Sequence, residues 1–230
     1  MRLTRDWKSM AAPDNDDTPR IVPESAMASD RTVNTPLSIL NMSGLKPIVG
    51  WSSALAFAYI VVAIGLTLAP LTVIAVVLLG VFYWTFLEYL LHRWMLHWEP
   101  EKPAYRAIRK CFPSHRPHHN EPADERKNVK LQLKMTVYLS LAHTVFLGIT
   151  IMPLWASLAL NAGILFGYQA YEYVHVACHH LPMRNFWART LKRHHAVHHH
   201  RDETVNFGVT TTIWDTVFRT TWRPERAAAT

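Results

Sequence analysis

The chain has 230 residues, half of them hydrophobic, and a formal net charge of +7. Its mean hydropathy of +0.00 averages two kinds of segment, because residues 47–87 and 135–171 contain no Asp, Glu, Lys or Arg. Helices of soluble proteins average about 10–14 residues, whereas a membrane span needs about 20 apolar ones. The composition therefore excludes a soluble globular protein. Cys111 and Cys178 alone also exclude a disulfide framework and a cysteine-based zinc site.

Residues 1–46 are polar, contain four prolines and include an acidic cluster at positions 14–17. They lack the apolar core of a signal peptide. We expect a disordered cytosolic tail here, followed by one integral membrane domain over residues 47–230.

Each apolar stretch is about twice the length of one span and has a proline near its middle, Pro70 in the first and Pro153 in the second. Proline interrupts the hydrogen bonding of a helix, so each marks the turn of a helical hairpin. The predicted spans are about 47–69, 71–91, 134–152 and 154–174. The second pair is short, and a hairpin that enters the membrane and returns stays an alternative. The fold class predicted is an all-α membrane protein with four transmembrane helices and a cytosolic, histidine-rich helical cap.

Lysine and arginine lie only outside the apolar stretches: six in residues 1–46, ten in 92–134 and eight in 175–230. Four spans place these three segments on one side of the membrane. The positive-inside rule assigns that side to the cytoplasm. We therefore expect a multi-pass protein with cytoplasmic termini and histidine clusters, and we interpret the net charge as a topology signal without a role for nucleic acid.

Thirteen of the 14 histidines lie in the predicted cytoplasmic segments. On a helix, residues three and four apart share a face, so several of these side chains should point together. His92 and His97 are about 140° apart on an ideal α-helix and converge only where the helix bends or ends. The exception, His143, is expected to be a polar residue packed between helices. The clusters are His92 and His97; His115, His118 and His119; His175, His179 and His180; and His194, His195, His198, His199 and His200.

So many imidazoles at one membrane face exceed the needs of a single metal and predict two ions. Imidazole binds iron, zinc, copper and nickel. Glu88 and Glu172 share helical faces with the first and third clusters. We expect each to accept a hydrogen bond from a ligand ring, which would orient it. Direct ligation and, for Glu88, a salt bridge to Arg93 are the alternatives.

Three stretches resemble the membrane fatty acid hydroxylase superfamily, nearest to its fatty acid 2-hydroxylase branch and related to the sterol desaturases. They are residues 86–97, residues 171–180, and His195-x-x-His198-His199 with residues 206–210 and 214–218. The resemblance implies a dimetal centre on a four-helix membrane stalk with a cytosolic lobe. Its spacing to Phe207 selects His195, His198 and His199 over His194 and His200. The implied ligands are His92, His97, His115, His118, His119, His175, His179, His195, His198 and His199.

The chain departs from the family pattern at Arg219, where glycine is usual, so the local turn is expected to differ. No cytochrome b5-like domain precedes the first span, so we expect a separate electron donor, ferredoxin-like or cytochrome b5-like, with its reductase.

The predicted function is an O2-dependent di-iron lipid hydroxylase that inserts oxygen into a C–H bond of a fatty acyl chain or acyl lipid. Catalytic residues beyond the metal centre are not assigned. Zinc can replace iron in purified samples, since both accept imidazole nitrogen. One alternative is a sterol or carotenoid hydroxylase, or a desaturase, of the same superfamily. An alternative of another class is a non-redox zinc-binding membrane protein or a metal carrier.

Overall fold

A computed structural model describes residues 45–98, 100, 102, 105–106, 115–122, 124 and 133–223, and within them the secondary structure is entirely helical. The all-α class predicted from the sequence is confirmed. The predicted disordered tail falls almost wholly on residues 1–44, which lie outside the described residues.

The first hairpin consists of α1 (Leu45–Thr67) and α2 (Pro70–Leu90). The chain reverses at Leu68, which has a left-handed φ of 54°, and Pro70 occupies the first turn of α2, where its missing N–H costs nothing. The turn predicted at this proline is confirmed. Leu45–Thr67 and Pro70–Leu96 are both long and apolar enough to cross a membrane.

The second hairpin consists of α5 (Leu133–Thr150) and α6 (Leu154–His180), with Pro153 between them as predicted. Helix α6 is longer than expected and continues to His180. It stops because Pro182 disfavours helical backbone in the preceding residue, and Leu181 is extended (φ −110°, ψ 150°). The third histidine cluster therefore lies on a continuation of the apolar helix.

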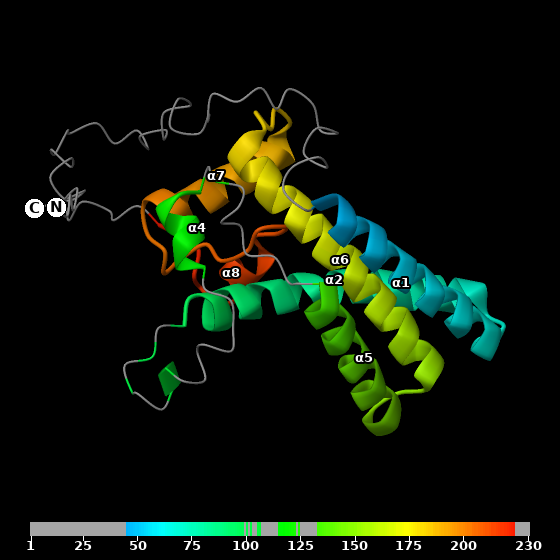
Figure 1. Ribbon diagram of the computed structural model, residues 1–230. Coiled ribbons are helices and arrows are strands. Elements are labelled where there is room, and N and C mark those ends of the chain that lie inside the picture. Colours follow the sequence, from blue (N-terminus) through cyan, green and yellow to red (C-terminus); the bar gives the residue numbers. More distant parts are fainter. Residues whose placement is uncertain are drawn as a thin grey trace, which may run out of the picture.

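Helix α6 packs against α1, α2 and α5, so it is the central helix of the bundle; Figure 1 shows it running beside α1. Small residues allow the closest contact. A Cβ on Gly163 of α6 would lie 2.0 Å from the Val77 carbonyl oxygen of α2, and one on Gly80 would lie 2.2 Å from the Leu160 oxygen. The backbones of α2 and α6 touch at this pair of glycines.

The outer faces of the bundle are apolar. Phe57 of α1 is 66% exposed, Leu78 of α2 is 65% exposed and Phe146 of α5 is 58% exposed. Only 22% and 17% of the apolar windows of the two candidate spans are buried within the protein. Apolar surfaces of this size are uncommon on soluble proteins, so α1 and α2 are candidate membrane spans by composition and by exposure.

Three shorter helices lie together at the end of the bundle where α2 and α6 terminate (Figure 1): α4 (Arg116–Asn120), α7 (Phe186–His200) and α8 (Ile213–Val217). Helix α7 begins at a capping residue, because the Asn185 side-chain oxygen accepts the Ala188 N–H at 2.8 Å. Helices α4 and α7 carry seven of the 14 histidines to this end of the bundle.

Candidate metal centre

The histidines gather into two groups in which one nitrogen of each ring lies within 4.8 Å of the others. The groups adjoin, since the rings of His119 and His199 stack with centroids 4.1 Å apart. The first group is His92, His97, His115 and His119, and the second is His118, His175, His179, His195 and His199.

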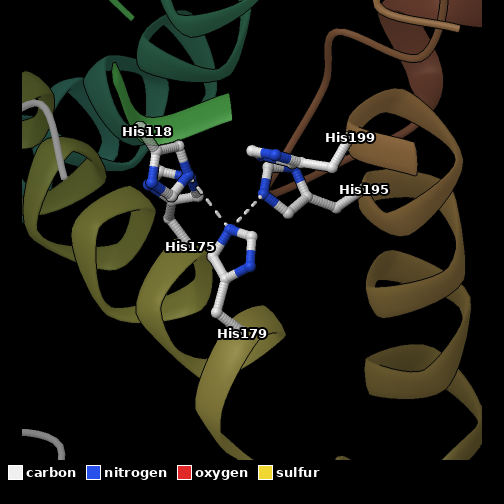
Figure 2. A group of neighbouring side chains, drawn as sticks. All are labelled: His118, His175, His179, His195 and His199. Carbon is white, nitrogen blue, oxygen red and sulfur yellow. Dashed lines mark hydrogen bonds between the residues drawn. The ribbon is translucent and has the colours of Figure 1, made fainter. Parts of the chain in front are cut away.

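Figure 2 shows the second group, which draws on α4, α6 and α7. His179 lies between its neighbours: its Nε2 is 3.1 Å from His118 Nε2 and 2.9 Å from His195 Nε2. The i, i+4 pairs His175 with His179 on α6 and His195 with His199 on α7 present two rings from each helix, as their spacing requires.

The first group depends on a change of helix type. Helix α2 continues as η4 (Leu91–Leu96), a π-helix, and the His97 N–H bonds to the His92 carbonyl at 3.3 Å. A π-turn bonds residues five apart, so it brings together two side chains that an α-helix would separate. The ring centroids of His92 and His97 are 5.0 Å apart.

His198 joins the first group as a fifth ring, because its Nε2 lies 3.0 Å from His97 Nε2 and its centroid is 4.6 Å from that of His92. All ten histidines implied by the resemblance thus lie in one cluster of two halves. His194 faces Asp215, with Nε2 2.9 Å from Oδ2, and His200 is exposed. His143 bonds to Asn161 of α6 at 2.9 Å, which confirms its predicted packing between helices.

The buried nitrogens fit metal ions. Ring nitrogens with no hydrogen-bond partner among the described residues are costly in a dry site unless a metal takes them. They are His92 Nε2, His118 Nδ1, His119 Nε2, His195 Nδ1 and both nitrogens of His115, His175 and His199.

Electrostatics keep these rings neutral. Burial and neighbouring histidines lower the pKa of His118 and of His119 to about 3. Burial, reinforced by neighbouring histidines, also holds the pKa of His115 and of His195 well below the usual value. Neutral imidazole offers a lone pair, so at neutral pH the cluster presents the form that a metal requires.

Glu88 accepts hydrogen bonds from two backbone amides and from the Thr210 hydroxyl, not from a ring, which corrects the expectation that it accepts from His92. Its Oε1 accepts the Val209 and Thr210 amides at 2.6 and 2.8 Å. The His92 Nδ1–H donates instead to the Phe207 carbonyl at 2.6 Å. The local helical face correctly indicated that Glu88 is buried beside the site, but its partner comes from a distant segment. Glu172 is also buried on α6, one turn before His175.

The sequence reasoning missed one residue beside the site. Asp215 of α8 is fully buried and bonds to the segment around Phe207; the only available signal was its place in the quoted stretch 214–218. Arg219 was expected to alter its turn. It has a φ of 57°, so it adopts the left-handed conformation that glycine prefers.

The fold and the site define a helical protein with two candidate membrane spans and a cluster of ten histidines that could hold metal. The model of the fatty acid hydroxylase family matches residues 77–220. This chain belongs to the fatty acid hydroxylase family.

The relatives with similar sequences are named as fatty acid, ceramide or fatty acyl hydroxylases. The chain is 37% identical over 150 residues to the ceramide very long chain fatty acid hydroxylase SCS7 of Saccharomyces cerevisiae, covering 64% of this chain and 38% of that protein. It is 31% identical over 148 residues to mouse fatty acid 2-hydroxylase, covering 64% and 39%. It is 33% identical over 155 residues to the Arabidopsis thaliana dihydroceramide fatty acyl 2-hydroxylase FAH2, covering 63% and 60%. The alignments therefore span less than two thirds of each relative.

A solved structure has the same fold. It is described as full length scs7p with only the hydroxylase domain visible, and it shares 29% sequence identity with this chain at a TM-score of 0.69. The match covers 86% of this chain and 74% of that one.

Proposed function

We propose that this protein is an O2-dependent di-iron hydroxylase that inserts oxygen into a C–H bond of a fatty acyl chain or acyl lipid. The observation that carries the proposal is the cluster of ten histidines at the end of apolar helices. Several buried ring nitrogens of this cluster have no hydrogen-bond partner among the described residues. Family membership supports lipid hydroxylation as the activity.

Each metal ion would be held by five imidazoles. One set is His92, His97, His115, His119 and His198, and the other is His118, His175, His179, His195 and His199. Two bound irons would supply the oxidising power that an unactivated C–H bond demands, using O2 and electrons from a donor.

The residues of the chain prepare the site in three ways. Burial keeps the rings neutral and so ready to bind metal. The carbonyl oxygens of Phe207 and Val205 accept from His92 Nδ1 and His198 Nδ1, which turns each Nε2 towards its group. The enclosing helices exclude water, which protects an oxidising site from wasteful reaction. Glu172 is the residue we assign to orient the rings of α6.

An acyl chain is the substrate class that the surroundings fit. A cavity of about 150 Å³ lies between α2, α5 and α6, with apolar side chains such as Leu87, Leu139 and Leu165 in its lining. This hydrocarbon-compatible space reaches Leu91, the residue before His92. Two relatives are named for ceramide and fatty acyl hydroxylation. We therefore favour an acyl chain within a larger lipid as the form of the substrate. A ferredoxin-like or cytochrome b5-like donor would supply the electrons.

The same proposal includes four membrane spans with cytoplasmic termini and histidines. Helix α5 has 18 residues, or about 27 Å at 1.5 Å per residue. Its outer face is apolar, as in Phe146 and Ile149. Helix α6 runs beside α1 (Figure 1), which supports a position for it across the same layer of the membrane. A reporter fused after Thr230 should be active in the cytoplasm, and activity only outside it would contradict this topology.

The function is tested by growing cells with and without the gene under 18O2 and analysing total lipids by mass spectrometry. We expect 18O-labelled hydroxyl groups on acyl chains only where the gene is present. His198→Ala should abolish the label and the bound iron. His200→Ala on the same helix is the matched control and should keep both. New double bonds without 18O, or label in a sterol or carotenoid, would contradict acyl hydroxylation.

A further inference from the structure

One irregular segment contacts two histidines from different helices. We call residues 205–210, between α7 and α8, the clamp loop. Its Val205 carbonyl accepts the His198 Nδ1–H at 2.7 Å, and its Phe207 carbonyl accepts the His92 Nδ1–H at 2.6 Å. A carbonyl can only accept, so both rings carry their proton on Nδ1 and present the Nε2 lone pair to the first histidine group. Both rings are at most 1% exposed.

Asp215 fixes the part of the clamp loop that holds His92. Its Oδ1 accepts the Phe207 N–H and its Oδ2 accepts the Gly208 N–H, both at 2.8 Å. Its remaining bonds come from Thr220 Oγ1 at 2.8 Å and His194 Nε2 at 2.9 Å. Because four donors bond to a carboxylate that is 0% exposed, the orientation of the carboxylate is fixed.

The approach of the loop to Asp215 is close enough to require glycine. A Cβ on Gly208 would lie 2.9 Å from Asp215 Oδ2 and 2.1 Å from the Thr211 carbonyl oxygen. At the far end of the loop, Glu88 accepts the Val209 and Thr210 amides. The loop is thus tied by one carboxylate to α8 and by another to α2, with the two carbonyls directed at the histidines.

We propose that Asp215 is a positioning residue of the metal centre: it acts through the clamp loop to set the tautomer and direction of His92 and His198. The inference rests on the proposed function, since it assigns these rings as ligands. Asp215 bonds to neither ring itself. We expect its effect at the first metal site, because both rings belong there. Among the described residues, no histidine of the second group forms a hydrogen bond to the clamp loop.

Asp215→Asn is the sharpest perturbation. The amide has one acceptor oxygen and one donor nitrogen. Whichever way it is turned, either the Phe207 or the Gly208 N–H faces an N–H in place of an oxygen. The loop must shift, and the carbonyl bonded to His92 shifts with it. Lost support of this kind costs about 10- to 100-fold in metal affinity.

The test measures Zn²⁺ binding to the full-length apoprotein in detergent, by competition with a chromophoric chelator. The wild type should bind two equivalents. Asp215→Asn should bind one equivalent with unchanged affinity and the other about 10- to 100-fold more weakly. Gly208→Ala, which displaces the loop by a different route, should give the same pattern. Thr216→Ala, an exposed change on α8 that removes only its bond to Thr212, should match the wild type.

The outcomes distinguish a failure of the positioning role from a failure of the proposed function. Two unchanged equivalents in both Asp215→Asn and Gly208→Ala would overturn the positioning role while leaving the metal centre intact. Equal weakening of both equivalents would also overturn it, because a general loss of structure has no preference for the first group. A wild-type protein that binds no Zn²⁺ and no iron would instead refute the proposed function.

Discussion

The contact between α2 and α6 offers a direct test of the packing. In Gly163→Ala, the new methyl carbon would lie 2.0 Å from the Val77 carbonyl oxygen and 2.7 Å from the Gly80 Cα. Real Cβ atoms essentially never approach another heavy atom within 3.0 Å, so the helices must separate locally by about 1 Å. Neither obstacle can rotate away, because both are backbone atoms.

The magnitude follows from a matched control. Alanine favours a helix over glycine by about 1 kcal/mol, a gain that Gly163→Ala and Gly65→Ala share. Gly65 of α1 has nothing within 4 Å of its would-be Cβ, so that variant receives the gain alone. Overpacking costs about 1–3 kcal/mol, and this is the expected difference in unfolding free energy between the two variants.

Thermal unfolding of both variants in the same detergent measures the difference, and metal analysis follows its effect on the site. Gly163→Ala should unfold at a lower temperature than Gly65→Ala. It should also hold less metal, because α2 continues into His92 and α6 carries His175. Equal stability of the two variants would refute the close crossing of these helices.

Three other predictions concern single residues. Arg219→Gly relieves a left-handed φ of 57° and should stabilise the protein by about 1 kcal/mol, seen as a raised Tm; a lowered Tm would contradict this. Burial lowers the pKa of His118 from 6.5 to about 3, so the unfolded chain takes up the proton at a higher pH than the folded one. The free energy of unfolding of the apoprotein is therefore retained above pH 6.5 and declines as the pH falls towards 3. At pH 5 the loss from this histidine is about 2 kcal/mol. Unfolding of the apoprotein at pH 7.5 and pH 5 checks it, and equal stability would argue against a neutral buried ring. Glu172→Gln should keep part of the turnover, whereas Glu172→Ala should lose about 10- to 100-fold with bound iron retained. Iron content and turnover are measured for both variants. Loss of one iron in both would indicate direct ligation by Glu172.

The sequence predicted the features that depend on neighbours along the chain. Pro70 and Pro153 mark the two helical turns, and the i, i+3, i+4 spacing of His195, His198 and His199 places three rings on one side of α7. These patterns are local consequences of helical geometry. The grouping of the histidines was therefore predictable from local spacing, whereas the choice of ten among them came from the family resemblance.

Features that join distant segments were not accessible. Glu88 and Val209 are 121 positions apart, and His92 and Phe207 are 115 apart, so no periodicity links them. The crossing at Gly80 and Gly163 depends in the same way on how two hairpins dock. The sequence correctly placed Glu88 on the helical face of His92, but the acceptor of the ring proton is the Phe207 carbonyl, and any residue type could supply a backbone carbonyl.

The π-helical segment η4 has a consequence for how this region tolerates changes in length. An α-turn places side chains four residues apart above one another, and a π-turn does so for five. Deleting one residue between His92 and His97 would leave the imidazoles at the spacing that suits an ordinary α-helix. The ring pair can therefore survive a single-residue deletion if the helix rewinds. Two residues fewer would leave an i, i+3 pair, which also shares a face of an α-helix, so the pairing fails only when three residues are deleted.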